Sequence, residues 1–381
     1  MGTTVAFPQG SGCSKRNLLE GSPSMPGNRR IVAAIATGLL TTSDVAGQTL
    51  QQSAESAPLV LEAKIPLGDV RGRIDHLAID LGRQRLFVAE LGNDSVAVVD
   101  LKDRKVIRRI AGLSEPQGVG YVPWSDTLLV ANARDGSLRM FAGAEYSEAG
   151  KIKPGDDADN IRVDAGANRV FGGYGGGALA VFDGASRDKI ADIPLKGHPE
   201  GFQLSRSGDR IFVNVPDARE VAVIDRQAGK QIASWPMRGA IGNFPMALDG
   251  DRSPVFSVFR YPPKLGVFSM QDGKVVAGTS TCGDADDIFV DAMRHRAYVS
   301  CGAGSLDVID TQDDSYRRMA RIPTVAGART VLFAPDLDRL FLAVRAQRGE
   351  TASIWIFRPP PSPADELSRG KPLLQTCGNE K

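Results

Sequence analysis

A strand-like motif recurs along the chain at a nearly constant spacing, and this period most constrains the fold. Each copy is a short run rich in β-branched and other apolar residues, as in RLFVA and RIFVNV. A second such run follows each copy, for example SVAVVD after the first and SLDVID after the sixth. The first residues of the seven copies lie 41 to 44 positions apart and are Arg85, Thr127, Arg169, Arg210, Pro254, Arg296 and Arg339. A period near 40–45 residues with about four strands per repeat is typical of a β-propeller.

We therefore predict an all-β fold, a seven-bladed β-propeller of four-stranded antiparallel blades over residues 58–359. The segment Leu59–Ile65 resembles the fourth strands of later repeats, but no first, second and third strands precede it. The last repeat lacks a fourth strand, because the proline-rich run RPPPSP follows its third strand. We expect the N-terminal strand to close the last blade, since closure removes an exposed sheet edge.

The residues before the repeats have the pattern of an export signal. Arg29 and Arg30 precede the apolar stretch Ile31–Leu40, and short side chains lie before a plausible cleavage point at Gln48. This order is typical of a secretory signal peptide. We predict a non-native leader upstream of the true start at 1–24, a signal peptide at 25–47, a linker at 48–57 and a disordered tail at 360–381. A cytoplasmic protein with a chance apolar stretch is the alternative.

The predicted location is the periplasm or the outside of the cell. Cys282 precedes the first strand of the sixth repeat and Cys301 ends its second strand, so antiparallel pairing brings them within disulfide range. An exported protein would oxidise this pair, whereas two buried thiols are the alternative. A formal net charge of +1 indicates no nucleic-acid partner. The repeats contain no run able to span a membrane, and we expect a monomer.

Polar residues precede the innermost strand of each repeat, where the loops of a propeller gather at one end of its axis. We name this end the axial funnel. The ligand-binding candidates are Asp75, His76, Gln117, Asp159, Asn160, His198, Glu200, Asn243, Asp286, Asp287 and Arg329. Carboxylates crowded round one axis raise each other's pKa unless a cation lies among them. Their surplus therefore predicts a cation, a cationic ligand or a proton-transferring site.

Two classes of function stay open for the funnel. In one, it binds a small ligand or a partner protein without chemistry. In the other, a divalent cation is held by Asp159, Asn160, Glu200, Asn243 and Asp286. Such oxygen ligands suit Ca²⁺, and His76 and His198 would favour Zn²⁺. With His76 and Glu200 as catalytic residues, the metal would make a hydrolase such as a lactonase. A wet channel mouth without any ligand is the third interpretation.

The units LFVAELGNDSVAVVD, IFVNVPDAREVAVID and AYVSCGAGSLDVID resemble the YVTN-type, YncE-like β-propeller family. The resemblance covers about Pro58 to Pro359 and implies an exported seven-bladed propeller. Lactonase-like and gluconolactonase-like propellers, to which the chain is more distantly similar, use an axial divalent cation held by acidic and amide side chains. Residues of these types in this chain are Glu200, Asn160, Asn243 and Asp286. The architecture itself carries many unrelated functions.

Overall fold

The structure is a computed structural model that describes residues 57–250 and 254–361. The predicted leader and signal peptide, and nearly all of the predicted linker and tail, lie outside the described residues. Those parts of the domain prediction stay untested.

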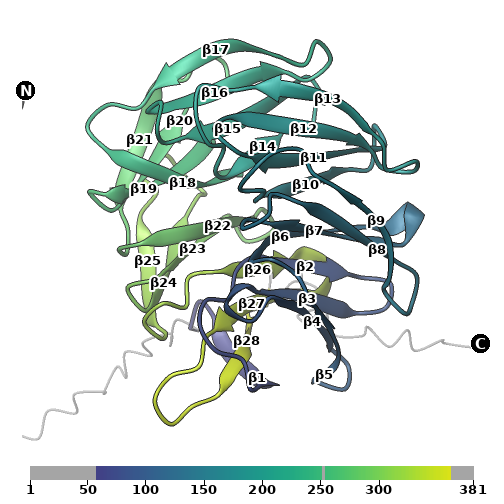
Figure 1. The fold of residues 1–381 in the computed structure, drawn as a ribbon. Coiled ribbons are helices and arrows are strands. Elements are labelled where there is room, and N and C mark those ends of the chain that lie inside the picture. Colours follow the sequence, from purple (N-terminus) through teal and green to yellow (C-terminus); the bar gives the residue numbers. More distant parts are fainter. Residues whose placement is uncertain (1–56, 251–253, 362–381) are drawn as a thin grey trace, which may run out of the picture. The chain divides into compact units, whose positions relative to one another are not determined.

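The described strands form seven antiparallel four-stranded sheets round a central axis (Figure 1). The innermost strands are β2 (Leu77–Asp80), β6 (Pro116–Val122), β10 (Ile161–Asp164), β14 (Phe202–Leu204), β18 (Ile241–Leu248), β22 (Ala285–Asp291) and β26 (Val331–Ala334). The second strands are β3 (Arg85–Glu90), β7 (Thr127–Asn132), β11 (Arg169–Tyr174), β15 (Arg210–Val215), β19 (Val255–Tyr261), β23 (Arg296–Cys301) and β27 (Arg339–Val344). We number the blades one to seven in this order.

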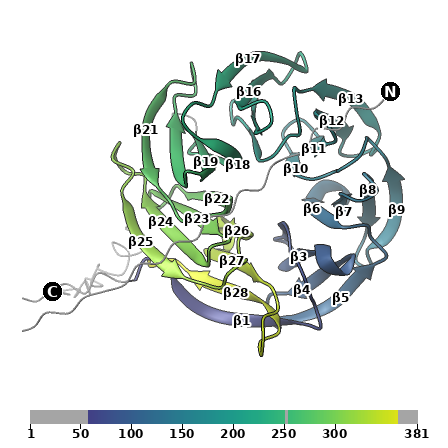
Figure 2. The same ribbon diagram turned by 60° about the vertical axis from the view of Figure 1, so that its left-hand side comes forward.

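The outer half of each blade has the same plan. The third strands are β4 (Ser95–Asp100), β8 (Leu138–Ala142), β12 (Ala178–Asp183), β16 (Glu220–Asp225), β20 (Lys264–Phe268), β24 (Ser305–Asp310) and β28 (Ala352–Arg358). The fourth strands are β5 (Lys105–Ala111), β9 (Ser147–Ile152), β13 (Lys189–Pro194), β17 (Lys230–Pro236), β21 (Val275–Ser280), β25 (Arg318–Pro323) and β1 (Val60–Gly68). Figure 2 shows the fourth strands on the perimeter of the ring. The seven-bladed fold predicted from the period is thereby confirmed.

The last blade is closed by the N-terminal strand, as predicted. β1 pairs antiparallel with β28, from Val60 opposite Arg358 to Gly68 opposite Ala352. The second strands begin at the predicted residue in six blades. In blade five, β19 begins at Val255, one residue after the predicted Pro254. A proline has no N–H to donate to a β-ladder, which is consistent with this shift.

The core lies between the blades, because successive side chains of a strand point to opposite faces of a sheet. In β3, Leu86 and Val88 belong to the apolar cluster shared with blade seven. Phe87 and Ala89 belong to the cluster shared with blade two. Each second strand is therefore buried on both faces. Clusters of this kind join every neighbouring pair of blades in the described part of the chain.

The helical content of the described residues is confined to three single-turn 3₁₀ helices: η1 (Leu91–Asn93), η2 (Pro123–Ser125) and η3 (Pro335–Leu337). None of the helices found among residues 57–250 and 254–361 has the length and apolar character needed to cross a membrane.

Two cross-links reinforce blade six. Cys282 and Cys301 form the predicted disulfide, with Cα atoms 5.8 Å apart. On the neighbouring blade boundary, the buried guanidinium of Arg294 lies 3.0 Å from Asp291 Oδ2 and 2.8 Å from Asp338 Oδ1. Asp338 belongs to blade seven, so its contact with Arg294 links blade six to blade seven.

Candidate functional site

Two connected cavities lie on the axis, in the region where the funnel was predicted. The larger has a volume of about 300 Å³ and the smaller about 160 Å³. Both are lined by Arg73, Asp159, Glu200, Phe244 and Asp286. The smaller cavity adds Gln117, Asp157, His198, Arg260 and Arg329. The remaining polar residues of the larger cavity are His76, Asn160, Arg162, Gln203 and Asp287.

Backbone hydrogen bonds beyond the innermost strands set the positions of the funnel side chains. The amide of Asp159 donates to the carbonyl of Gly173, and the amide of Gly173 donates back to Asn160. The same reciprocal pair links Asp75 and His76 with Ala89 in blade one. It also links Glu200 and Gly201 with Asn214 in blade four. Asp75, Asp159 and Glu200 therefore occupy equivalent positions in three blades.

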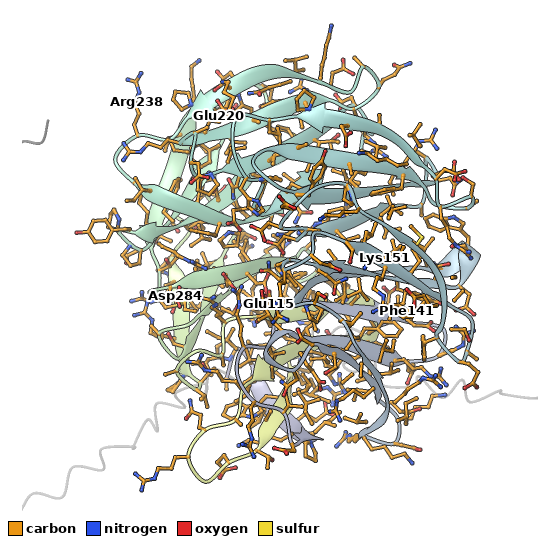
Figure 3. The ribbon with its side chains drawn as sticks, viewed as in Figure 1. Glu115, Phe141, Lys151, Glu220, Arg238 and Asp284 are labelled. Carbon is orange, nitrogen blue, oxygen red and sulfur yellow. A yellow bond between two sulfur atoms is a disulfide. The ribbon has the colours of Figure 1, made fainter. Side chains whose placement is uncertain are left out.

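Arginine side chains neutralise one side of the funnel. Arg329 lies 3.1 Å from Asp284 and 3.0 Å from Asp286. Arg260 is also paired with both of these carboxylates, and its guanidinium lies 3.8 Å from the ring centroid of Phe244. In Figure 3, Asp284 is labelled in blade six, whereas Arg238 lies at the outer edge of the ring.

Arg260 and Phe244 line the funnel but were not predicted from the sequence. Arg260 lies near the end of a second strand, β19, where the loops on this face also begin. Phe244 follows Asn243 inside β18, and a run of apolar residues there indicated only core. Arg260 could have been predicted from its position near the end of a second strand of the repeat. Nothing in the local sequence distinguished Phe244 from a packing residue.

The buried carboxylate of Asp75 pairs with two partly exposed cationic side chains, His76 and Arg73. Asp75 Oδ2 lies 2.7 Å from Arg73, and Asp75 Oδ1 lies 2.8 Å from His76 Nδ1. Burial opposes charge on His76, but Asp75, Asp159 and Asp287 outweigh it and raise the pKa of His76 to about 10. Burial likewise opposes charge on Asp75, yet His76 and Arg73 hold its pKa below the ordinary value. His76 is therefore a cation at neutral pH, which does not suit the role of general base.

No arginine of the described residues forms an ion pair with Asp159 or Glu200. Asp159 is 6% exposed, and its Oδ1 atom has no hydrogen-bond partner among the described residues. The closest cationic atom to it is His76 Nδ1 at 3.9 Å. Burial is the main cause that raises the pKa of Asp159 to about 6. Burial and the charge of Asp159 raise the pKa of Glu200 to about 7. Asp159 and Glu200 are therefore two carboxyl groups of the funnel whose charge is not neutralised by an arginine of the described residues.

Asp287, Gln117 and His198 also line the cavities, and a polar atom of each contacts another polar group of the protein. Asp287 Oδ2 accepts a hydrogen bond from the amide of Val331, and burial raises the pKa of Asp287 to about 7. Gln117 Nε2 lies 3.3 Å from Asp157 Oδ1. His198 Nδ1 lies 2.8 Å from the carbonyl oxygen of Gly175, so that nitrogen carries the proton and Nε2 is left for a ligand.

The residues expected to hold a divalent cation are not all brought together. Asn243 lines neither cavity, because its buried Nδ2 donates to Asn214 Oδ1 and to the carbonyl of Glu220. Asp286 is engaged by two arginines. Within residues 57–250 and 254–361, no three His, Cys, Asp or Glu side chains are placed to hold one ion. The donor set therefore does not fit the axial metal that the distant resemblance implied.

Comparisons with known proteins support the fold and leave the family open. No protein-family model matches the chain, and no curated protein matches it. Among solved structures, hydrazine synthase of Kuenenia stuttgartiensis aligns with a TM-score of 0.58 at 17% sequence identity. The alignment covers 72% of this chain and 93% of the matched chain. At this identity the likeness shows a shared β-propeller architecture and nothing about activity.

Proposed function

We propose that this protein is a binding propeller whose axial funnel takes a small molecule bearing a protonated amine. The observation that carries the proposal is a pair of carboxyl groups, the buried Asp159 and the partly buried Glu200, with which no arginine or lysine of the described residues forms an ion pair. Asp75, Asp284 and Asp286 are instead paired with Arg73, Arg260 and Arg329. An ammonium group placed between Asp159 and Glu200 would supply the missing charge.

The size of the site agrees with a small ligand. Cavities of about 300 Å³ lie at the lower end of the range that binds small molecules. The aromatic ring of Phe244 lines both cavities and provides an apolar wall beside the carboxylates. A whole partner protein could reach only the mouth of the funnel, so the deeper carboxylates favour the small molecule.

Membership of the YVTN-type family and export belong to the same proposal. The repeat sequences support the family, and the disulfide between Cys282 and Cys301 supports an oxidising compartment. An exported binding propeller would meet its ligand in the periplasm or outside the cell.

Isothermal titration calorimetry with three linear probes tests the amine site. Hexylamine, hexanol and hexanoate share one chain length and differ in charge. We expect hexylamine to bind near neutral pH and hexanol and hexanoate to bind more weakly. The double substitution Asp159→Asn with Glu200→Gln should abolish hexylamine binding. Glu145→Gln, on a side chain that is 81% exposed, is the matched control. Equal binding of hexylamine and hexanol would refute the proposal.

Hydrolysis is the second candidate, favoured by one observation. A carboxyl group with a pKa of about 7, as for Glu200, exchanges protons efficiently near neutral pH. The test is a screen of lactones and esters, with Ca²⁺ or Zn²⁺ added in separate arms. Turnover that disappears in Glu200→Gln but persists in Glu145→Gln would establish it. No turnover in any arm would leave binding alone.

A further inference from the structure

The seven innermost strands surround a central channel, which we call the axial channel. One ring of residues round this channel contains a single charged side chain. The second strands of the seven blades can be aligned residue by residue. At one aligned position, the second-strand residue of every blade pairs with one residue of the innermost strand. The second-strand residues at this position are Phe87, Leu129, Phe171, Phe212, Phe256, Tyr298 and Phe341. Their innermost-strand partners are Ala78, Gly120, Arg162, Gln203, Ala247, Phe289 and Leu332. Because the register is shared, these partners form one ring, and Arg162 is its charged member.

The guanidinium of Arg162 has no anionic partner among the described residues. It lines the larger cavity, and its Nη1 donates to the carbonyl of Ile161 at 2.8 Å. It also lies 5.3 Å from the ring centroid of Phe202. The arginines at the mouth differ, because each of them is ion-paired. Arg162 is thus the cation of the channel that is left for a ligand.

The surroundings of Arg162 make an anion favourable there. Burial lowers the pKa of Arg162, and the more distant charges of Asp287 and Asp159 offset this only in part. Even a partly buried guanidinium without a counter-ion is unfavourable, and its planar fork matches a carboxylate in a bidentate contact. A ligand carboxylate at this level would satisfy the guanidinium directly.

The amine site and Arg162 lie at two levels of the same cavity. Asp159 precedes Arg162 by three residues in one extended segment, so their Cα atoms are separated by about 10 Å at most. Between and beside them the cavity is lined by the apolar side chains of Leu77, Val119, Ile288 and Leu332. Along the channel, the carboxylates of Asp159 and Glu200 are therefore followed by an apolar wall and then by the guanidinium of Arg162.

We propose that the axial channel binds a zwitterionic molecule whose amine and carboxylate are separated by an apolar chain. The amine binds Asp159 and Glu200, which rests on the proposed function, and the carboxylate binds Arg162. An ω-amino acid has this arrangement, whereas an α-amino acid holds both charges at one end. The cavity thus selects for the distance between two opposite charges.

Four probes test the proposal by isothermal titration calorimetry. They are 6-aminohexanoate, its isomer norleucine with adjacent charges, hexylamine and hexanoate. We expect 6-aminohexanoate to bind at least about tenfold more tightly than hexylamine, since a charged hydrogen bond contributes this much. Norleucine and hexanoate should bind more weakly than 6-aminohexanoate.

Two variants separate this proposal from the proposed function. Arg162→Gln should remove the advantage of 6-aminohexanoate, so that it binds no more tightly than hexylamine binds to the same variant. Arg238→Gln, on the outer edge of the ring in Figure 3, should bind all four probes as the parent does. Thermal melting checks that each variant is folded. If Arg162→Gln does not fold, the ranking of the four probes on the parent protein still decides.

The outcomes that overturn the two proposals differ. Equal affinity for 6-aminohexanoate and hexylamine would overturn the role of Arg162 and leave the amine site standing. Equal affinity for norleucine and 6-aminohexanoate would overturn the charge separation. Binding of hexanoate without hexylamine would overturn the amine site, and the zwitterionic ligand would fall with it.

Discussion

Replacing Glu200 by glutamine tests the electrostatics of the funnel through stability alone. The substitution keeps the shape of the side chain and removes its negative charge. Burial and the neighbouring Asp159 raise the pKa of Glu200 from the ordinary 4.5 to about 7. Because the folded-state pKa lies above the unfolded-state value, the stabilising contribution is complete below about pH 4.5. It is lost as the pH rises through about 7.

The expected magnitude follows from the two pKa values. A pKa unit corresponds to about 1.4 kcal/mol, so ionised Glu200 destabilises the fold by about 3 kcal/mol at about pH 8. At about pH 5 the same relation between pKa and stability gives a destabilisation of only about 1 kcal/mol. Glu200→Gln should therefore raise the free energy of unfolding by about 2 kcal/mol more at the higher pH than at the lower.

Urea unfolding followed by tryptophan fluorescence at both pH values measures this difference. Glu145→Gln is the matched control, because its exposed carboxylate should change stability by less than about 0.5 kcal/mol at either pH. An equal gain for Glu200→Gln at both pH values would refute the reasoning. So would a loss of stability at about pH 8, because it would mean that Glu200 is satisfied by a partner in solution.

Three further substitutions test other parts of the structure. Replacing Cys282 and Cys301 by serine opens a loop with a sequence separation of 19 and should cost about 3 kcal/mol. An unchanged urea midpoint would contradict a formed disulfide. Arg294→Ala should cost about 3 kcal/mol, because it leaves the buried Asp291 unpaired. Arg83→Ala, at a more exposed ion pair, should cost less. His76→Asn should destabilise most below about pH 6.5, and the penalty should fade as the pH rises through about 10. A penalty that does not change with pH would show that His76 acts only by packing.

Much of the candidate site could be predicted from its position in the repeat. The period places each loop before an innermost strand, and equivalent positions in different blades meet at one axis. Asp159 and Glu200 were found in this way, although they lie 41 residues apart in the chain. His198 and Arg329, which line the smaller cavity, were predicted as funnel residues by the same reasoning.

The partners of these residues could not be predicted in this way. Asn243 stands at a loop position in the repeat, yet its amide turns into the protein and bonds to Asn214. Arg260 lies near the end of β19 in blade five and pairs with carboxylates of the neighbouring blade six. Such contacts depend on which way a side chain turns, and the repeat period contains no information about this.

The sequence by itself determined the number of blades, their strands and the closure of the last blade. These features follow from alternation and spacing, which are local along the chain. Only the tertiary structure decided which carboxylates of the funnel are neutralised and which are not. Asp286 gained two arginines from neighbouring blades, whereas in the described part of the chain no arginine pairs with Asp159 or Glu200. The physical reason is that burial and charge pairing are sums over residues from all sides of the axis, which meet only when the ring is closed.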